Sequence, residues 1–129
     1  DGVDPARVVI GHTMTHLVNE GDTVREWMRR GATFLPTNLR MDMDWDFIEQ
    51  LVQAIRDLFQ EGLGDHIVLG LDWAFENEQG PFIPCSFMPP PPYVYMFTHT
   101  LPRFRALGLE EEAIEQMLVT NPARILPVQ

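Results

Sequence analysis

Three short apolar runs recur along the chain, covering residues 7–12, 32–38 and 67–73. The third run follows a glycine-rich turn, and residues 67–71 are all apolar or glycine. A continuous apolar run of this length is typical of a strand buried on both faces, which belongs to a parallel sheet covered by helices. Pro36 should lie near the end of the second strand because it cannot donate to a ladder.

Helical periodicity marks the segments between and after these runs. The predicted helices are residues 23–30, 46–60, 93–107 and 110–119. Asp22 is a plausible N-cap for the first helix and Gly31 its stop, with a polar turn before it. Pro102 should kink or interrupt the third helix. Shorter turns are expected after Asp4-Pro5 and after Asn121-Pro122.

Each predicted helix has an apolar stripe that should face the core. Trp27 and Met28 form part of this stripe in the first helix, and Phe59 does so in the second. In the third helix the expected inner face consists of Val94, Phe97, Leu101, Phe104 and Leu107.

The alternation of strand and helix predicts right-handed βαβ units in one α/β domain spanning residues 1–129. Three parallel strands are too few to close a barrel, so both sheet edges would be open and something else should cover them. Residues 74–92 form a long loop with four consecutive prolines at 89–92, and loops of this length tend to be functional or mobile.

Charge and composition exclude several classes of partner. Nine arginines, no lysine and nineteen acidic residues give a net charge of -10, which argues against a nucleic-acid surface and against binding to anionic lipid. No apolar stretch approaches about 20 residues and no export signal is visible, so we expect a cytoplasmic protein that does not span a membrane. The absence of an initial Met suggests processing or a piece of a longer protein.

Candidate chemistry lies where the predicted strands end. Those ends present His12, then Thr37 and Asn38, then Asp72. The carboxyl ends of parallel strands meet at one edge, so an imidazole and a carboxylate would converge there and suit a divalent metal such as zinc. The structural alternative is that His12 bonds a loop carbonyl and Asp72 caps the following turn. Spacing alone leaves both interpretations open.

The remaining histidines and the cysteine are weaker candidates. His16 follows His12 by four residues and is a possible relay group or extra ligand. His66 and His99 are expected to be structural. Cys85, the only cysteine, lies in the proline-rich loop with no base nearby in the sequence, which argues against a nucleophile.

Four segments in the right order resemble the C-terminal portion of the phosphotriesterase family of metal-dependent amidohydrolases. They are residues 2–12 (GVDPARVVIGH), 72–75 (DWAF), 101–108 (LPRFRALG) and 119–126 (VTNPARIL). The resemblance implies that the chain forms the last three βα units of an eight-stranded TIM barrel. We therefore expect the N-terminal half of the barrel, or an oligomer, to cover its sheet edges.

The resemblance also implies roles for individual residues. His12 matches the metal-binding histidine that ends the sixth strand. Asp72 matches the aspartate that ends the eighth strand, binds metal and handles a proton. Trp73 and Phe75 match aromatic positions beside the leaving-group pocket, and Asn38 lies near the position where phosphotriesterases carry a histidine. Family members use a pair of metals, often zinc, to hydrolyse phosphotriesters and lactones.

The chain also departs from the family pattern. It contains no His-x-His and no lysine, so the other metal ligands must come from outside it. Thr13-Met14-Thr15 replaces an aspartate that usually follows the sixth-strand histidine. We therefore expect a lactone or related ester as the small-molecule substrate rather than an organophosphate, and little activity from the chain alone. The alternative is a non-catalytic half-barrel that serves as an interaction module.

Overall fold

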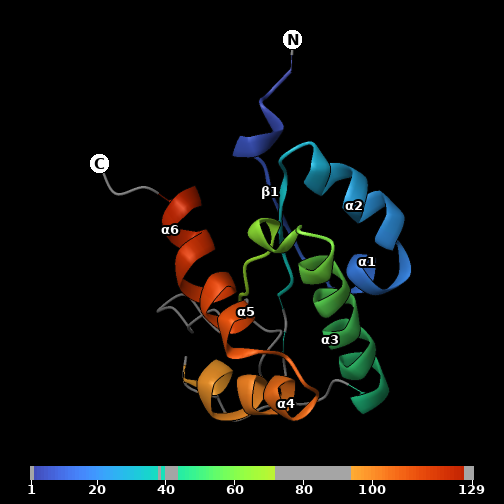
Figure 1. The fold of residues 1–129 in the computed structure, drawn as a ribbon, viewed down its shortest axis with the longest axis vertical. Helices are drawn as coiled ribbons and strands as arrows, with labels where there is room; N and C mark the ends of the chain where they lie inside the picture. The colour runs from blue at the N-terminus through green and yellow to red at the C-terminus, as the bar shows by residue number, and fades with distance from the viewer. Residues whose placement is uncertain (1, 38, 40–43, 72–93, 127–129) are drawn as a thin grey trace, which may run out of the picture.

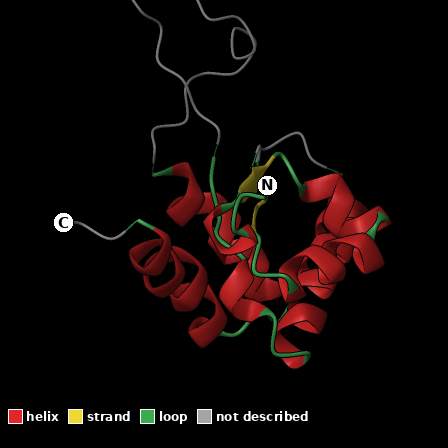
Figure 2. Cartoon of the chain, turned by 90° about the horizontal axis from the view of Figure 1, so that it is seen from above, coloured by secondary structure: helices red, strands yellow, loops and turns green. Residues whose placement is uncertain are grey.

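A short parallel sheet lies among helices in the computed structural model, which describes residues 2–37, 39, 44–71 and 94–126 (Figures 1 and 2). Strands β1 (Val9–Gly11) and β2 (Thr33–Leu35) pair in parallel, with Val9 opposite Thr33 and Gly11 opposite Leu35. The fold is therefore mixed α/β, as the alternating pattern predicts.

The third apolar run lies beside β2 but forms a single bridge rather than a full strand. Ile67 pairs in parallel with Phe34. The Val68 amide then donates to the Phe34 carbonyl at 3.0 Å, and the Gly70 amide donates to the Pro36 carbonyl at 3.2 Å. These bonds make β2 the middle of three parallel segments, and we call residues 67–71 the third segment. The remainder of the predicted strand, Asp72 and Trp73, lies outside the described residues.

The region before β2 contains two helices, α1 (Met14–Asn19) and α2 (Gly21–Arg29). The prediction of a polar turn is therefore wrong, because α1 occupies that stretch. The predicted N-cap role of Asp22 is also wrong, because Asp22 lies within the first turn of α2. Leu17 is buried in α1, where Met14 and Val18 also pack against the core. This spacing of three and four residues is itself helical, and the polar residues between these positions obscured it.

Gly31 ends the α2 region in a conformation that side chains rarely adopt, with φ at 109°. A Cβ built there would lie 3.2 Å from the Ala6 backbone nitrogen, whereas one built at Gly62, with φ at 76°, would meet open space. We expect Gly62→Ala to lower the free energy of unfolding by about 1 kcal/mol and Gly31→Ala by roughly 2 kcal/mol, since only the second adds a clash to the left-handed penalty. Urea unfolding of both variants measures the difference, and equal losses would contradict it.

Helix α3 (Trp45–Gln60) confirms the strongest predicted helix and lies at the centre of the core. Asp44 caps it by accepting a hydrogen bond from the Asp46 amide. Its buried face consists of Ile48, Leu51, Val52, Ile55 and Leu58. Phe59, at the end of the helix, packs against the core as expected.

Both C-terminal helical regions contain a π-helical turn just before a proline. The turn η4 (Met96–Thr100) leads into α4 (Leu101–Ala106), and η5 (Gln116–Thr120) joins α5 (Glu111–Glu115) to α6 (Asn121–Ile125). Pro102 and Pro122 each lie in the first turn of the helix that follows. Because proline has no N–H, it cannot continue the ordinary bonding ladder, and the wider π turn accommodates this gap.

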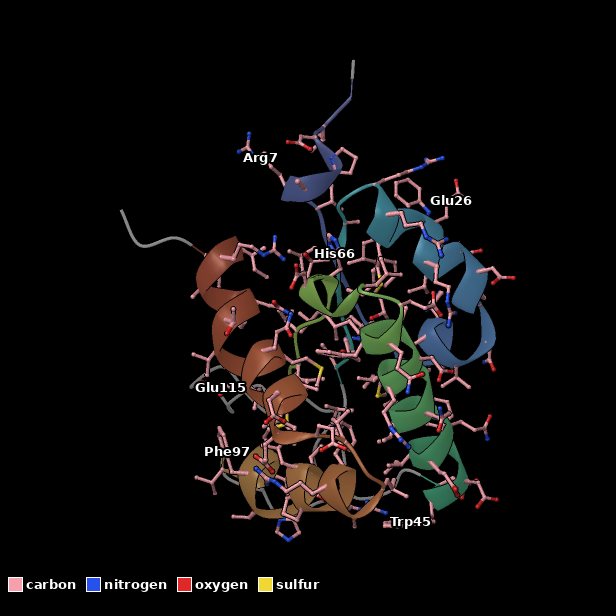
Figure 3. The ribbon with its side chains drawn as sticks, viewed as in Figure 1. Arg7, Glu26, Trp45, His66, Phe97 and Glu115 are labelled. Carbon is pink, nitrogen blue, oxygen red and sulfur yellow. The ribbon has the colours of Figure 1, made fainter. Side chains whose placement is uncertain are left out.

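Several predicted core residues are at the surface. Trp27 is 40% exposed and Phe97 is 61% exposed, and Val94 is also exposed. Figure 3 shows the Phe97 side chain at the outside of η4. The π turn changes the angular position of Phe97, so a face counted at the α-helical period fails there. Met28, Leu101 and Phe104 are buried as predicted, and Leu107 is partly buried against the core.

An exposed ion pair joins α4 to the start of α5. The Arg105 guanidinium donates to both Glu111 carboxylate oxygens. This hydrogen bonding holds the pKa of Glu111 below its ordinary value and raises that of Arg105. Any contribution to stability is therefore present above the ordinary carboxyl pKa and is lost as the pH falls through the lowered one.

None of the helices that the structure describes is both long and apolar enough to cross a membrane.

Candidate functional site

The candidate site lies at the carboxyl edge of the parallel segments, where His12 directly follows β1. His12 is the only non-glycine residue among those described with a positive φ, at 57°. Side chains adopt this left-handed region at a cost of about 1–2 kcal/mol, and residues held there cluster at functional sites. The His12 side chain is exposed at this edge, so its imidazole is accessible.

Thr37 brings the end of the middle segment against His12. Its hydroxyl lies 3.3 Å from His12 Nδ1, within hydrogen-bonding distance, and the Thr37 side chain is only 6% exposed. This contact is not the only interaction that His12 makes. Two of the predicted strand-end residues are therefore in contact, as expected for neighbouring parallel strands.

The third segment reaches the same edge on the other side of Thr37. A Cβ built on Gly70 would lie 3.1 Å from Leu35 Cδ1 and 3.5 Å from Thr37 Cγ2, so glycine permits a close approach of this backbone to β2. The segment continues to Leu71, the residue before Asp72.

Four of the five predicted site residues lie outside the described part of the chain. They are Asn38, Asp72, Trp73 and Phe75. Cys85 also lies there. Their proposed roles remain predictions. Within the described ranges no group of three or more His, Cys, Asp or Glu side chains could hold a metal.

The other histidines do not join His12 among the contacts that the structure describes. His16 lies in α1 and faces Glu20 at 3.9 Å on the surface. His66 lies at the amino end of the third segment, as Figure 3 shows, which is the opposite edge of the sheet from His12. His99 stacks on Tyr95 with ring centroids 4.5 Å apart.

A pocket of about 170 Å³ lies between β1 and the helices α1 and α2. Its lining includes Ile10, Val24, Trp27 and Phe34, with His16 and Glu20 among the polar groups. Thr13 also lines it, and the Thr13 hydroxyl is buried with no hydrogen-bond partner among the described residues. The sequence pattern does not predict this pocket, because residues of α1 line it and α1 was not among the predicted helices.

The sequence pattern also did not reveal the structural role of Asn121. Its side chain is 1% exposed, and its amide donates to the carbonyls of Gly64 at 2.8 Å and Ile67 at 2.6 Å. The sequence pattern predicts only a short turn at Asn121-Pro122, whereas the Asn121 hydrogen bonds fix the start of the third segment. The residue types around Asn121 do not signal these two bonds.

A parallel sheet with helices around it and the polar side chains of His12 and Thr37 at its carboxyl edge defines the class of the chain as an α/β protein. Residues 1–126 match the phosphotriesterase family. The chain belongs to the phosphotriesterase family, a hydrolase family that is generally metal-dependent.

Solved structures agree with this assignment. The phosphotriesterase from Mycobacterium tuberculosis superposes with a TM-score of 0.73 at 25% identity, covering 98% of this chain and 38% of that one. The organophosphorus hydrolase from Deinococcus radiodurans gives 0.65 at 26% identity, covering 96% and 38%. The phosphotriesterase homology protein from Escherichia coli, complexed with phosphate, gives 0.70 at 22% identity, covering 95% and 39%, and supports the fold alone.

The chain thus spans about 38% of the length of the structures it resembles. No curated protein matches it.

Proposed function

We propose that this chain is the C-terminal part of a metal-dependent hydrolase and contributes the last three βα units of its TIM barrel. The observation that carries the proposal is the placement of His12 in a strained left-handed conformation at the carboxyl edge of the sheet, where barrel enzymes hold their catalytic groups. Family membership and the family's general dependence on metal support it.

His12 and Asp72 would hold a divalent metal, for which zinc is the proposed identity. An imidazole nitrogen and a carboxylate oxygen are ordinary zinc ligands, and the exposed His12 ring leaves room for further ligands from outside the chain. A bound ion of this kind lowers the pKa of water and polarises an acyl or phosphoryl oxygen. Asp72 would also accept a proton, while Asn38, Trp73 and Phe75 would contact the substrate.

A lactone or related ester is the proposed substrate class. The sequence after His12 is Thr13-Met14-Thr15, which contains no carboxylate. Thr13 is buried, so it cannot stand in as a solvated proton carrier. Proton relay behind Asp72 is therefore reduced, and a substrate with a more reactive centre than an organophosphate suits such a site.

The preceding βα units are the proposed partner of the β1 edge. Within the described sheet β1 is an edge strand, and the apolar pocket beside it is lined by the partly exposed Trp27. An unpaired strand edge with an apolar hollow next to it is a surface that parallel β/α proteins cover. In the phosphotriesterase from Mycobacterium tuberculosis, more than half of the chain has no counterpart in the present chain.

Expression of the chain with and without the coding sequence upstream of Asp1 tests the proposal. We expect the longer protein to carry zinc by elemental analysis and to hydrolyse a simple lactone, and the chain alone to do neither efficiently because it lacks the other ligands. The upstream sequence should contain a His-x-His, and a lysine and a histidine that end strands. If the longer protein has those features and binds no metal, the assignment as a metal-dependent hydrolase is wrong. A natural start codon near Asp1 would favour the non-catalytic interaction module.

A further inference from the structure

We propose that Asn121 is a positioning residue for the candidate site, because its buried amide sets the register of the third segment on β2. The third segment runs to the carboxyl edge beside Thr37 and leads, in the sequence, directly to Asp72, the proposed metal ligand. The consequence for hydrolysis rests on the proposed function, whereas the register itself is a property of this chain.

The apolar sequence of the third segment does not define its own register. Residues 67–71 are all apolar or glycine, and the neighbours Ile67 and Val68 are both buried, at 0% and 6% exposure. A slip of one residue turns every side chain of a strand to the opposite face of its sheet. Here a slip would exchange one apolar residue for another on both faces, so the loss of burial would oppose it only weakly. The register therefore depends on contacts outside the apolar run.

Asn121 supplies a fixed point at the start of the third segment. Its amide nitrogen lies 2.8 Å from the Gly64 carbonyl and 2.6 Å from the Ile67 carbonyl, and these two carbonyls span the turn η2 (Gly64–His66). A carbonyl only accepts hydrogen bonds, so both amide hydrogens are used and the orientation of the side chain is determined. Ile67 is also the residue that pairs with Phe34 on β2. A slip of Ile67 along β2 would break at least one of the two bonds.

The helical region that carries Asn121 is itself held in the core. Met117 precedes Asn121 by four residues, is 0% exposed and lies on the same helical face. The π turn η5 lies against η2, where the Gln116 amide donates to the Asp65 carboxylate at 2.5 Å. The Arg124 guanidinium donates to the Asp65 carbonyl. Asn121 therefore holds the third segment from a buried base, and two exposed contacts support it.

The register decides which residue lies against the candidate site. In the observed register this residue is Gly70, where a Cβ would lie 3.1 Å from Leu35 Cδ1 and 3.5 Å from Thr37 Cγ2. After a slip of one residue, Leu69 or Leu71 would occupy this place. Its side chain would separate the third segment from β2 at the edge that carries Thr37. Gly70 thus penalises the slipped register at one end of the segment, and Asn121 stabilises the observed register at the other.

Two alanine substitutions separate register from stability. Asn121→Ala removes both hydrogen bonds to the turn. Met117→Ala creates a cavity on the same buried face but leaves those bonds in place. The register is read in the purified chain by NMR, from scalar couplings across the hydrogen bonds that join the Val68 and Gly70 amides to their carbonyl partners, and from the exchange rates of these amides.

We expect both couplings in the unmodified chain and in Met117→Ala, and their loss in Asn121→Ala. Exchange at Val68 and Gly70 should rise in Asn121→Ala by about 10–100-fold relative to the amides of α3, which corresponds to two buried hydrogen bonds. Asn121→Ser keeps one donor and should give a selective rise of about 3–10-fold, so it decides the question should the alanine variant fail to fold.

A purely stabilising role for Asn121 predicts a different result. Exchange would then rise uniformly across the chain in the Asn121 variants, and the couplings of the folded fraction would persist. That result, or the same selective rise in Met117→Ala, would overturn the proposal.

A second measurement uses the longer protein that includes the upstream units. A displacement of about 1 Å caused by a mutation far from the chemistry can cost about 100-fold in rate, so Asn121→Ala should lower kcat/KM for a simple lactone by about 10–100-fold. Met117→Ala should stay close to the parent at a temperature where both variants are folded. If the parent hydrolyses the lactone and Asn121→Ala does so equally well, the positioning role is wrong and the hydrolase stands. If the parent is inactive, the proposed function fails, and the NMR measurements on the chain still decide whether Asn121 sets the register.

Discussion

Replacing His12 with glycine is expected to abolish zinc binding by the longer protein without a comparable loss of stability. The imidazole is the proposed ligand, and losing even an outer-shell partner costs about 10–100-fold in affinity, so removal of the ligand itself should cost at least about 100-fold. Stability behaves differently, because φ at 57° is strained for histidine and unstrained for glycine.

The matched control is His12→Ala, which also removes the imidazole but retains a Cβ in the left-handed region. Both variants lose the hydrogen bond with Thr37, which is worth about 0.5–1.5 kcal/mol. The free energy of unfolding of His12→Gly should therefore lie within about 1 kcal/mol of that of the parent. The free energy of unfolding of His12→Ala should lie about 1 kcal/mol below that of His12→Gly. Calorimetric zinc titration and urea unfolding give the two quantities. Retained zinc affinity in His12→Gly would contradict the assigned ligand.

Asn121→Ala is expected to produce the largest loss of stability, roughly 2–4 kcal/mol. The Asn121 amide is buried and donates to the Gly64 and Ile67 carbonyls, which would both be left without these bonds in a small cavity. The same bonds join α6 to the start of the third segment, so the damage should spread to that segment. Hydrogen exchange of the Val68 and Gly70 amides, which bond to β2, should accelerate with it.

Two controls isolate the buried amide. Gln116→Ala removes an exposed hydrogen bond from the same helical region to Asp65, and should cost less than about 0.5 kcal/mol. Asn121→Asp keeps the shape but replaces the donor with an acceptor, so two carbonyls would face a carboxylate, and it should destabilise at least as much as alanine. A loss below about 1 kcal/mol for Asn121→Ala would show that the two hydrogen bonds do not hold the segment.

Helix α3 could be predicted because its capping residue and its apolar periodicity both indicate the same helix. The stripe in α3 has a cap at its start and spans four turns, so its periodicity is unambiguous. The α1 helix was missed because its six residues include only three apolar positions, between polar ones. The π turns could not be predicted from a count at 3.6 residues per turn, and Phe97 was assigned to the wrong face for that reason.

For the candidate site, the sequence predicts only which residues lie together at the carboxyl edge of the sheet, because it shows where each strand ends. That principle correctly brought His12 and Thr37 together, since parallel strands finish on the same side of the sheet. Nothing in the residue types indicated that His12 would adopt a left-handed backbone, or that Asn121 would bond to Gly64 and Ile67 from more than fifty residues away. Such features depend on tertiary packing, and a single sequence carries no direct record of it.

We propose that His12 and Asp72 jointly hold a metal at the carboxyl edge of the sheet. The decisive measurement is a crystal structure of the longer protein grown with zinc, with anomalous scattering recorded at the zinc edge. We predict a peak about 2.0–2.2 Å from a His12 ring nitrogen and from an Asp72 carboxylate oxygen. A fully occupied zinc site that touches neither residue, or His12 and Asp72 side chains at opposite edges of the sheet, would show that these two residues are not the metal ligands.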